Sequence, residues 1–353
     1  MILAELGADV VRVERPGGAS PLAVDTALNR SRPNVAVDLK QAAGVDVVHR
    51  LLDQADVLIE GLRPGVMERL GLGPEVCLAR NPRLVYGRMT GWGQEGPYAT
   101  MAGHDIMYAA VSGALHLCGT AEKPIVPVNV LADFGGGTLY LVTGVLAALL
   151  ARGSTGRGQV LDAAMVDGAA SLVTMFYGLF AQGLWQDRRG VNILDGGAPF
   201  YDTYECADGR WVAVGALEPQ FWRALNEELG LRFERGQYDP QGYAVQRAAY
   251  ERAFQGRTRD EWAAHFAGTD ACVAPVLGLG EAPRDPHLAA RGVFAEVDGQ
   301  TVPRVAPRFS AGPLPEPTPG RGVGADTVDY LSSHGFSREE VDALLSAGVL
   351  VQA

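Results

Sequence analysis

Strands and helices alternate in the N-terminal part of the chain, and this alternation limits which folds the chain can adopt. Residues 8–14, 56–60 and 84–90 are short apolar runs of the kind that form buried parallel strands. Residues 44–55, between the first two runs, repeat their apolar side chains with helical period. Strand, helix and strand at this spacing predict βαβ units. The predicted fold class is α/β, with a Rossmann-like, doubly wound parallel sheet in a large domain.

A second pattern begins after residue 190 and predicts a smaller α+β domain. Two β-like runs flank an Asp208-Gly209 pair, which is typical of a hairpin turn. The expected elements of this domain are two strands and three amphipathic helices, at 201–206, 210–215, 219–229, 243–255 and 258–267. The expected organisation is a large α/β domain at 1–185, a small α+β domain at 195–300 and a C-terminal return to the large domain at 301–353.

The charge and hydrophobicity of the chain limit the classes of partner that it is expected to bind. Its formal net charge is −11 and its pI is about 5.1, which argues against binding to nucleic acid or to an anionic membrane surface. With 353 residues, 47% of them hydrophobic, the chain can bury a large core. The apolar stretch 139–150 is shorter than the roughly 20 residues of a membrane span, so no membrane association is expected.

The cysteines and histidines show neither a metal-binding nor a redox pattern. Four cysteines lie far apart with no CxxC pair, which is typical of reduced residues in a cytosolic protein. The six histidines show no HExxH or similar spacing, so no metal is expected. Met1 leads directly into an amphipathic pattern with no visible signal peptide, and the expected location is the cytoplasm.

Gly91–Gly96 matches the GxGxxG pattern of dinucleotide-binding turns but lacks its context. Pro97 and Tyr98 follow where an apolar helix should begin, and no acidic residue ends a strand about 20 residues further on. We interpret the segment as a tight glycine loop.

The strongest candidates for chemistry are a histidine and a carboxylate, His104 and Asp133, on separate apolar segments. These segments, 104–117 and 134–151, are expected to form long helices, and each candidate has a glycine within two residues, so that backbone or ligand can approach closely. Such a pair can remove a proton from one side of a carbon and return it on the other. The plainer alternative is a buried histidine and a helix-capping aspartate.

Four basic residues suggest a site for an anionic ligand. Arg15, Lys40 and Arg63 follow predicted strands, where α/β sheets bind ligands, and Arg69 lies in the next short helix. In so acidic a chain, this grouping favours a phosphorylated ligand. The alternative is ordinary solvated surface charge.

Several blocks of the sequence resemble the family III CoA-transferases, the CaiB/BaiF-like family. The blocks are Gly7–Pro16, Asp38–Lys40, Leu58–Val66, Arg69–Gly73, Thr90–Gln94 and Gly156–Gln159. Three further blocks are similar to the racemase branch of this family, the α-methylacyl-CoA racemases: Gly103–Ile106, Asn129–Gly137 and Gly215–Phe221. Transferase relatives generally keep an aspartate at the place of Asp133 but usually lack the histidine. The presence of both His104 and Glu218 therefore favours the racemase branch.

The resemblance implies an isomerase of fatty acid metabolism that racemises or epimerises 2-methylacyl-CoA thioesters by two-base α-proton exchange through an enolate. It implies that His104 and Asp133 are the bases, that Glu218 holds His104, and that the backbone N–H of Asp105 stabilises the enolate oxygen. Coenzyme A is then part of the substrate, and no other cofactor is expected. The phosphates of coenzyme A would be held in the large domain by Arg15, Lys40, Arg63 and Arg69.

The resemblance also implies an interlocked homodimer in which Glu218 reaches His104 of the partner chain. Two alternatives remain: a CoA-transferase with Asp133 as covalent nucleophile, and a non-catalytic acyl-CoA-binding protein. Met107, Tyr108 and Leu131 suggest a pocket for an apolar acyl tail, although relatives carry a polar residue in place of Met107. Family members begin with a further strand and a glycine-rich turn, so the sheet is expected to be one strand short.

Overall fold

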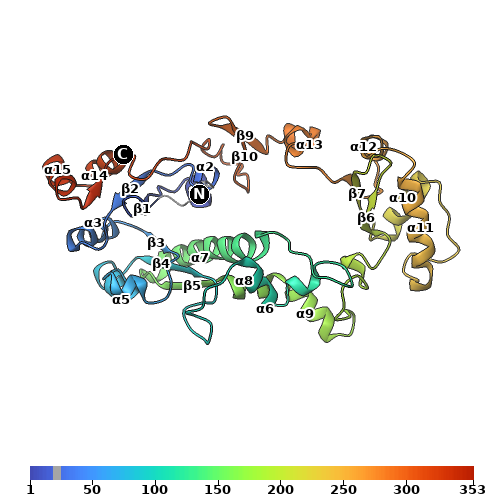
Figure 1. Ribbon diagram of the computed structural model, residues 1–353, viewed down its shortest axis with the longest axis horizontal. Coiled ribbons are helices and arrows are strands. Elements are labelled where there is room, and N and C mark those ends of the chain that lie inside the picture. Colours follow the sequence, from blue (N-terminus) through green and yellow to red (C-terminus); the bar gives the residue numbers. More distant parts are fainter. Residues whose placement is uncertain (19–24) are drawn as a thin grey trace. The chain divides into compact units, whose positions relative to one another are not determined.

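The computed structural model describes residues 1–18 and 25–353 and divides the chain into two compact units (Figure 1). Unit 1 comprises Met1–Gly103, Phe134–Gly168 and Pro283–Ala353, and unit 2 comprises His104–Asp133 and Ala169–Ala282. This division differs from the boundaries expected near residues 185–195, which fall inside unit 2. One reason is that residues after 104 pack on residues after 169: the Tyr177 hydroxyl donates to the Ser112 carbonyl at 2.9 Å.

The described residues of unit 1 form two three-stranded sheets and a separate hairpin. Its strands are β1 (Arg12–Glu14), β2 (Asn34–Val37), β3 (Val57–Glu60), β4 (Val85–Thr90), β5 (Val160–Ala164), β9 (Phe294–Val297), β10 (Gln300–Pro303) and β11 (Leu350–Val351). The sheet orders are β1-β2-β11, in which β11 is antiparallel, and β3-β4-β5, which is wholly parallel; β9 and β10 form the hairpin. The α/β class with parallel strands is confirmed. One continuous sheet was expected, whereas the described residues form two sheets, with β1 and β3 at their edges.

The helices of unit 1 connect these strands and cover them. They are α1 (Ile2–Glu5), α2 (Asp25–Leu28), α3 (Ala42–Leu52), α4 (Val66–Arg69), α5 (Pro74–Arg80), α7 (Tyr140–Thr155), α13 (Pro286–Ala290), α14 (Thr327–Ser333) and α15 (Arg338–Ser346). The helix expected at 44–55 is confirmed as α3. Ser337 and Glu340 form the capping box that begins α15, and Gly348, with φ +67°, follows its C-terminus.

The C-terminal helices complete the core around the first sheet. Val35 and Val37 of β2 are fully buried against Leu331 of α14, Val341 of α15 and Leu350 of β11. Burying each such side chain contributes roughly 1.5–3 kcal/mol. The last part of the chain therefore stabilises the strand that precedes Lys40.

The apolar helix that contains Asp133 is longer than the sequence suggested. A π-helix, η2 (Val130–Leu139), runs directly into α7, and together they form the helix Val130–Thr155. By length and composition this helix is able to cross a membrane, with a mean hydropathy of 1.7 and 28% of its most apolar window buried. The argument that the stretch is too short for a span was therefore wrong. Leu141, Val145 and Ala148 of this helix pack on Val85 of β4.

Unit 2 contains the expected antiparallel hairpin and its helices. Its elements are β6 (Tyr201–Glu205), β7 (Trp211–Gly215), β8 (Val273–Pro275), α6 (Asp105–Val111), α9 (Thr174–Ala181), α10 (Pro219–Glu228), α11 (Tyr243–Phe254) and α12 (Arg259–Phe266), with short 3₁₀ turns η1 (Leu115–Leu117), η3 (Ile193–Asp195) and η4 (Pro240–Gly242). The 3₁₀ turn η5 (Ala282–Arg284) and helix α8 (Met165–Leu172) span the borders of the units. The helix expected at 104–117 ends at Val111 because the chain turns at Gly113, whose φ is +81°.

The core of unit 2 is aromatic. Tyr204 of β6 stacks on Phe254 of α11 at 5.3 Å between ring centroids, and Phe254 meets Trp262 of α12 edge-on at 5.3 Å. Aromatic pairs of this kind add about 0.5–1.5 kcal/mol beyond their burial. This core gives rigid support to the β6-β7-β8 sheet, whose β7 leads into Glu218.

Candidate active site

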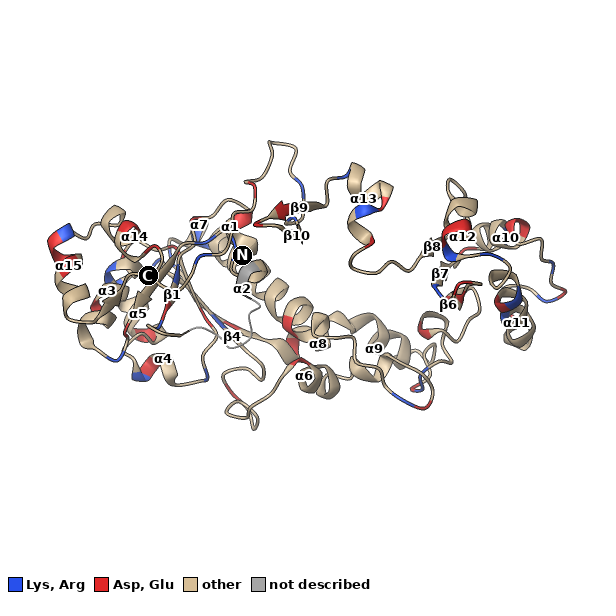
Figure 2. Cartoon of the chain, turned by 45° about the horizontal axis from the view of Figure 1, so that its top comes forward, with Lys and Arg blue, Asp and Glu red and all other residues tan. Residues whose placement is uncertain are grey.

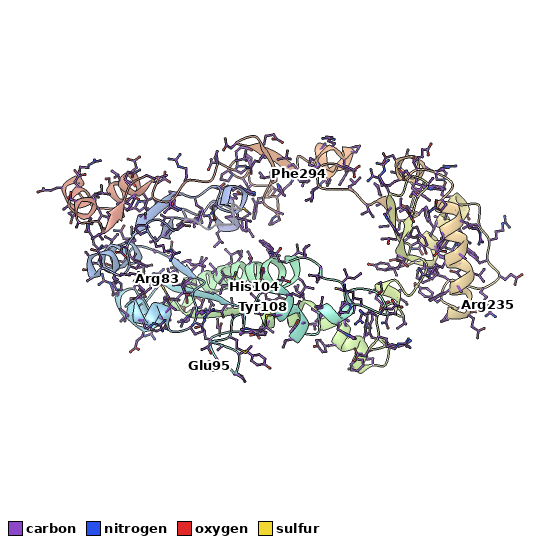
Figure 3. The ribbon with its side chains drawn as sticks, in the orientation of Figure 1. Arg83, Glu95, His104, Tyr108, Arg235 and Phe294 are labelled. Carbon is purple, nitrogen blue, oxygen red and sulfur yellow. The ribbon has the colours of Figure 1, made fainter. Side chains whose placement is uncertain are left out.

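His104 occupies the N-cap of α6. Its backbone is extended (φ −139°, ψ 168°), and its carbonyl accepts the first helical hydrogen bond, from the Met107 N–H at 2.8 Å. The side chain is exposed, which excludes the alternative of a buried histidine. Figure 3 labels His104 together with Tyr108, which belongs to the same helix.

Asp105, the first residue of α6, directly follows His104 and contacts the backbone of Asp133. Its side chain is only 4% exposed. The carboxylate oxygen Oδ2 accepts the backbone N–H of Ala132 at 2.7 Å and that of Asp133 at 2.8 Å. The residue after His104 therefore holds the peptide that carries Asp133. The sequence predicted a role for the Asp105 backbone alone, since nothing in a sequence pattern shows which distant amides a carboxylate accepts.

Asp133 lies in the π-helix η2 and is half-buried. Burial raises the pKa of its carboxyl group, and the nearby Asp105 carboxylate raises the pKa further. A hydrogen bond from Asn129 Nδ2 at 3.3 Å and the charge of His104 act in the opposite direction on this pKa. Asp133 therefore holds a proton more readily than an ordinary aspartate does. Asp133 does not cap a helix, so the plainer alternative fails for this residue as well.

The glycines after Asp133 allow a close helix crossing. A Cβ atom added to Gly168 of α8 would lie 1.8 Å from the carbonyl oxygen of Gly136 and 2.5 Å from its carbonyl carbon. The two backbones therefore touch, and Gly136 is itself buried. The expectation that a backbone approaches this glycine run is confirmed, and the crossing fixes η2 three residues beyond Asp133.

Glu218 occupies the N-cap of α10 but does not cap it with its side chain. The residue is exposed and has extended backbone angles, with Pro219 at the first helical position. Its charge helps burial to raise the pKa of the Cys272 thiol. Among residues 1–18 and 25–353, no hydrogen-bond donor reaches the Glu218 carboxylate.

The four predicted phosphate-binding residues are exposed and lie in unit 1. Arg15 follows β1 and Lys40 follows β2, and because these strands are parallel neighbours, both residues lie at the same edge of the first sheet. Arg63 follows β3, and Arg69 ends α4 with its guanidinium 3.3 Å from the place of a Cβ on Gly65. Arg15 and Lys40 thus follow strands of the first sheet, whereas Arg63 and Arg69 lie in the segment that follows β3 of the second sheet.

A buried ion pair supports the segment that contains Arg63 and Arg69. Arg88 of β4 donates to Glu60 of β3 at 2.9 Å and to Glu68 of α4 at 2.8 Å. The other oxygen of Glu60 accepts the backbone N–H of Leu62 at 2.7 Å. The loop that carries Arg63 is therefore held by hydrogen bonds before and after Arg63. The sequence analysis did not predict a role for Arg88.

The residues expected to line an acyl pocket differ in their exposure to solvent. Met107 is exposed, whereas Tyr108 is only 6% exposed. Burial and the nearby Asp133 charge raise the pKa of the Tyr108 phenol. Tyr108 therefore belongs to the surroundings of Asp133, and Met107 is the better candidate for contact with an apolar tail.

The described residues contain no group of three or more His, Cys, Asp or Glu side chains able to hold a metal ion. Gly91–Gly96 contains no helix, and Gly93 and Gly96 both have positive φ. The interpretation of this segment as a glycine loop rather than a dinucleotide turn is confirmed for its conformation.

The model of the family described as CoA-transferase family III matches residues 1–327. The chain is 45% identical to α-methylacyl-CoA racemase of Mus musculus, over 97% of this chain and 90% of the relative. It is 43% identical to α-methylacyl-CoA racemase of Homo sapiens, over 99% of this chain and 92% of the relative. A crystal structure of a CAIB/BAIF family protein from Brucella suis matches with a TM-score of 0.82 and 26% identity, over 94% of this chain and 93% of that one.

The chain therefore belongs to CoA-transferase family III. Nearly full-length similarity to racemases, at 43% and 45% identity, indicates an enzyme of the isomerase class.

Proposed function

We propose that this enzyme racemises 2-methylacyl-CoA thioesters by exchanging the proton on the α-carbon. The observation that carries the proposal is the link through Asp105, which ties the peptide of Asp133 to the helix that begins beside His104. This link supports the proposal, because it connects the segment of Asp133 to the helix that follows His104. The similarity to α-methylacyl-CoA racemases supports the choice of substrate.

In the proposed mechanism, the thioester carbonyl acidifies the α-carbon, and loss of the α-proton gives a planar enolate. One of His104 and Asp133 removes the proton from one face, and the other delivers a proton to the opposite face. The raised pKa of Asp133 supports this role, because a proton-transfer group works best when its pKa approaches the working pH. For the reverse direction, the two groups exchange roles.

The enolate oxygen needs a hydrogen-bond donor that is already in place. We assign this role to the backbone N–H of Asp105, since the amides of the first helical turn have no acceptor within the helix. Glu218 is assigned the role of holding His104 and favouring its protonated form. An exposed carboxylate that leaves its own helix uncapped supports this assignment.

Two substitutions are expected to move the acid limb of the pH–rate profile in opposite directions. Asn129→Leu removes a hydrogen bond that favours ionised Asp133, so the pKa of Asp133 rises and the limb moves to higher pH. Asp105→Asn removes a negative charge yet keeps an oxygen that accepts the two amides, so this pKa falls and the limb moves to lower pH. The measurement is kcat/KM against pH, starting from the epimer whose α-proton Asp133 removes. Shifts of the same sign in both variants would contradict the assignment of Asp133 as the titrating base.

We propose that Arg15, Lys40, Arg63 and Arg69 hold the phosphates of coenzyme A. Replacing one of them with Gln is expected to raise KM more than it lowers kcat, because phosphate contacts are similar in the ground state and the transition state. The loss is expected to shrink at high salt, where the unmodified enzyme has already lost part of the attraction. Arg291→Gln serves as a control, since Arg291 is an exposed arginine that directly follows α13. A large fall in kcat with unchanged KM would place these residues elsewhere.

We also propose that the enzyme is a homodimer whose site takes Glu218 from the partner chain. Supporting this proposal, the part of unit 2 around α9 exposes apolar side chains that a soluble chain usually covers. Leu172, Met175, Tyr177, Phe180 and Leu184 are between 46% and 68% exposed. Figure 2 shows α9 free of acidic and basic residues.

Mixed dimers are expected to recover activity if the site is shared. A dimer of one His104→Ala chain and one Glu218→Ala chain would have one site with both defects and one intact site. Such dimers, purified with two different tags, should show about half of the activity of the unmodified dimer by simple site counting. A fully active monomer, or mixed dimers no better than the single variants, would show that each site is built within one chain.

Incubation with one epimer of a 2-methylacyl-CoA in D₂O, without any acyl acceptor, tests the proposed function. Epimerisation with one deuterium at C2 is expected. If the reaction requires a free acid and moves the acyl group between CoA molecules, the enzyme is a transferase with Asp133 as nucleophile. Binding without exchange would identify a non-catalytic acyl-CoA-binding protein.

A further inference from the structure

The segment that leads into Glu218 is held from several sides. At the end of β7, the Gly215 N–H donates to the Cys272 carbonyl at 2.9 Å and the Ala216 N–H donates to the Phe200 carbonyl at 2.9 Å. These bonds continue the sheet on both sides of β7. They hold the N–H groups of Gly215 and Ala216. The carbonyl groups of Ala216 and Leu217 accept hydrogen bonds from other residues.

The carbonyl groups are taken by a loop between α10 and η4. Gln237, only 6% exposed, donates both N–H bonds of its side-chain amide, to the Ala216 carbonyl at 2.9 Å and the Leu217 carbonyl at 2.7 Å. The Tyr238 hydroxyl also donates to the Leu217 carbonyl. The Tyr238 ring is itself held edge-on against Phe200, with centroids 5.3 Å apart.

Two donors on the Leu217 carbonyl have a direct consequence for Glu218. The Leu217 carbonyl and the Glu218 N–H belong to one planar peptide group, so fixing the oxygen fixes the nitrogen and the Cα of Glu218. The backbone that carries the Glu218 carboxylate is therefore held in place, although the Glu218 side chain is exposed. A misplacement of about 1 Å at a catalytic group can cost a factor of about 100 in rate.

We propose that Gln237 and Tyr238 are positioning residues that aim Glu218 at the catalytic histidine. This inference rests on the proposed function, in which Glu218 holds His104. We call these two hydrogen-bond donors the clamp. Gln237 is its buried member and Tyr238 is its exposed member. In this proposal, both residues act through the position of Glu218 and not through contact with the substrate.

The test compares a mild and a stronger substitution with a matched control. Tyr238→Phe removes one hydroxyl at a half-exposed position, and Gln237→Met removes both amide donors while keeping the length of the side chain. Tyr243→Phe is the control, because Tyr243 also packs edge-on against Phe200, at 5.8 Å, and its hydroxyl has no hydrogen-bond partner among the described residues. All variants are made in the full-length chain, and circular dichroism checks that each one is folded.

Epimerisation of a 2-methylacyl-CoA is measured with each variant alone and combined with Glu218→Gln. Tyr238→Phe and Gln237→Met are expected to lower kcat about 10-fold with KM unchanged, a loss smaller than that of a fully misplaced group. In the Glu218→Gln background, neither substitution should lower kcat further, because the group on which they act is already lost. Tyr243→Phe should leave kcat unchanged in both backgrounds.

Three results would overturn the clamp. These are an unchanged kcat in both variants, a tenfold loss that persists in the Glu218→Gln background, and an equal loss in Tyr243→Phe. A lack of exchange by the unmodified enzyme would overturn the proposed function together with the clamp. An active enzyme that fails the comparison overturns the clamp alone.

Discussion

His104→Gln is expected to slow removal of the α-proton from one epimer by about 10²–10⁴-fold, the usual contribution of a general base. Exchange of the α-proton in the other epimer should persist, since Asp133 still removes that proton. Asp133→Asn should give the opposite preference. Net racemisation requires both groups and should be lost in both variants. The measurement is the initial rate of deuterium incorporation from D₂O into each pure epimer, followed by mass spectrometry.

A histidine outside the site provides the control for this comparison. His287 is exposed on α13, and His287→Gln should leave both exchange rates unchanged. Equal slowing of the two epimers by His104→Gln would contradict the assignment, because a residue that serves one face cannot affect both faces alike.

Gly168→Ala is expected to destabilise the protein by about 3 kcal/mol, at the upper end of the cost of overpacking a core. The added methyl group would lie 1.8 Å from a carbonyl oxygen of the facing backbone, so one helix must move. Because that carbonyl belongs to Gly136, the displacement reaches the turn that carries Asp133, and activity should fall as well. The measurement is unfolding by urea together with the rate of α-proton exchange.

Gly153→Ala is the matched control for this substitution. Gly153 lies in α7 with no heavy atom within 4 Å of an added Cβ. Replacing it with Ala should stabilise the helix by up to about 1 kcal/mol through helix propensity. Equal stability of the two alanine variants would show that the crossing at Gly136 is not tight.

The fold could be predicted from the sequence where a local pattern determines it. The period of apolar residues located β3, β4 and α3, and the Asp208-Gly209 pair located the β6-β7 hairpin. The first strand is shorter than expected, at Arg12–Glu14, because an apolar run does not show where hydrogen bonding to a neighbour stops. The π-helix was missed, since it shares its apolar composition with an α-helix.

The candidate site could be predicted only in part. His104 and Asp133 are visible because their residue types and neighbouring glycines suggest proton transfer. The side-chain roles of Asp105 and Gln237 depend on hydrogen bonds to backbone groups far along the chain, and any residue type can supply such groups. These hydrogen bonds cannot be predicted from the spacing of residues, so the residues that position the candidate site are found only in the structure.

The position of deuterium at early times tests the two-base mechanism most directly. One pure epimer of a 2-methylacyl-CoA is incubated with the enzyme in D₂O, and the two epimers are separated before a tenth of the substrate has reacted. Two bases on opposite faces predict one deuterium at C2 of the newly formed epimer and almost none in the recovered substrate. Deuterium appearing equally in both epimers, or a new epimer that retains the original proton, would contradict the assignment of His104 and Asp133 as separate bases.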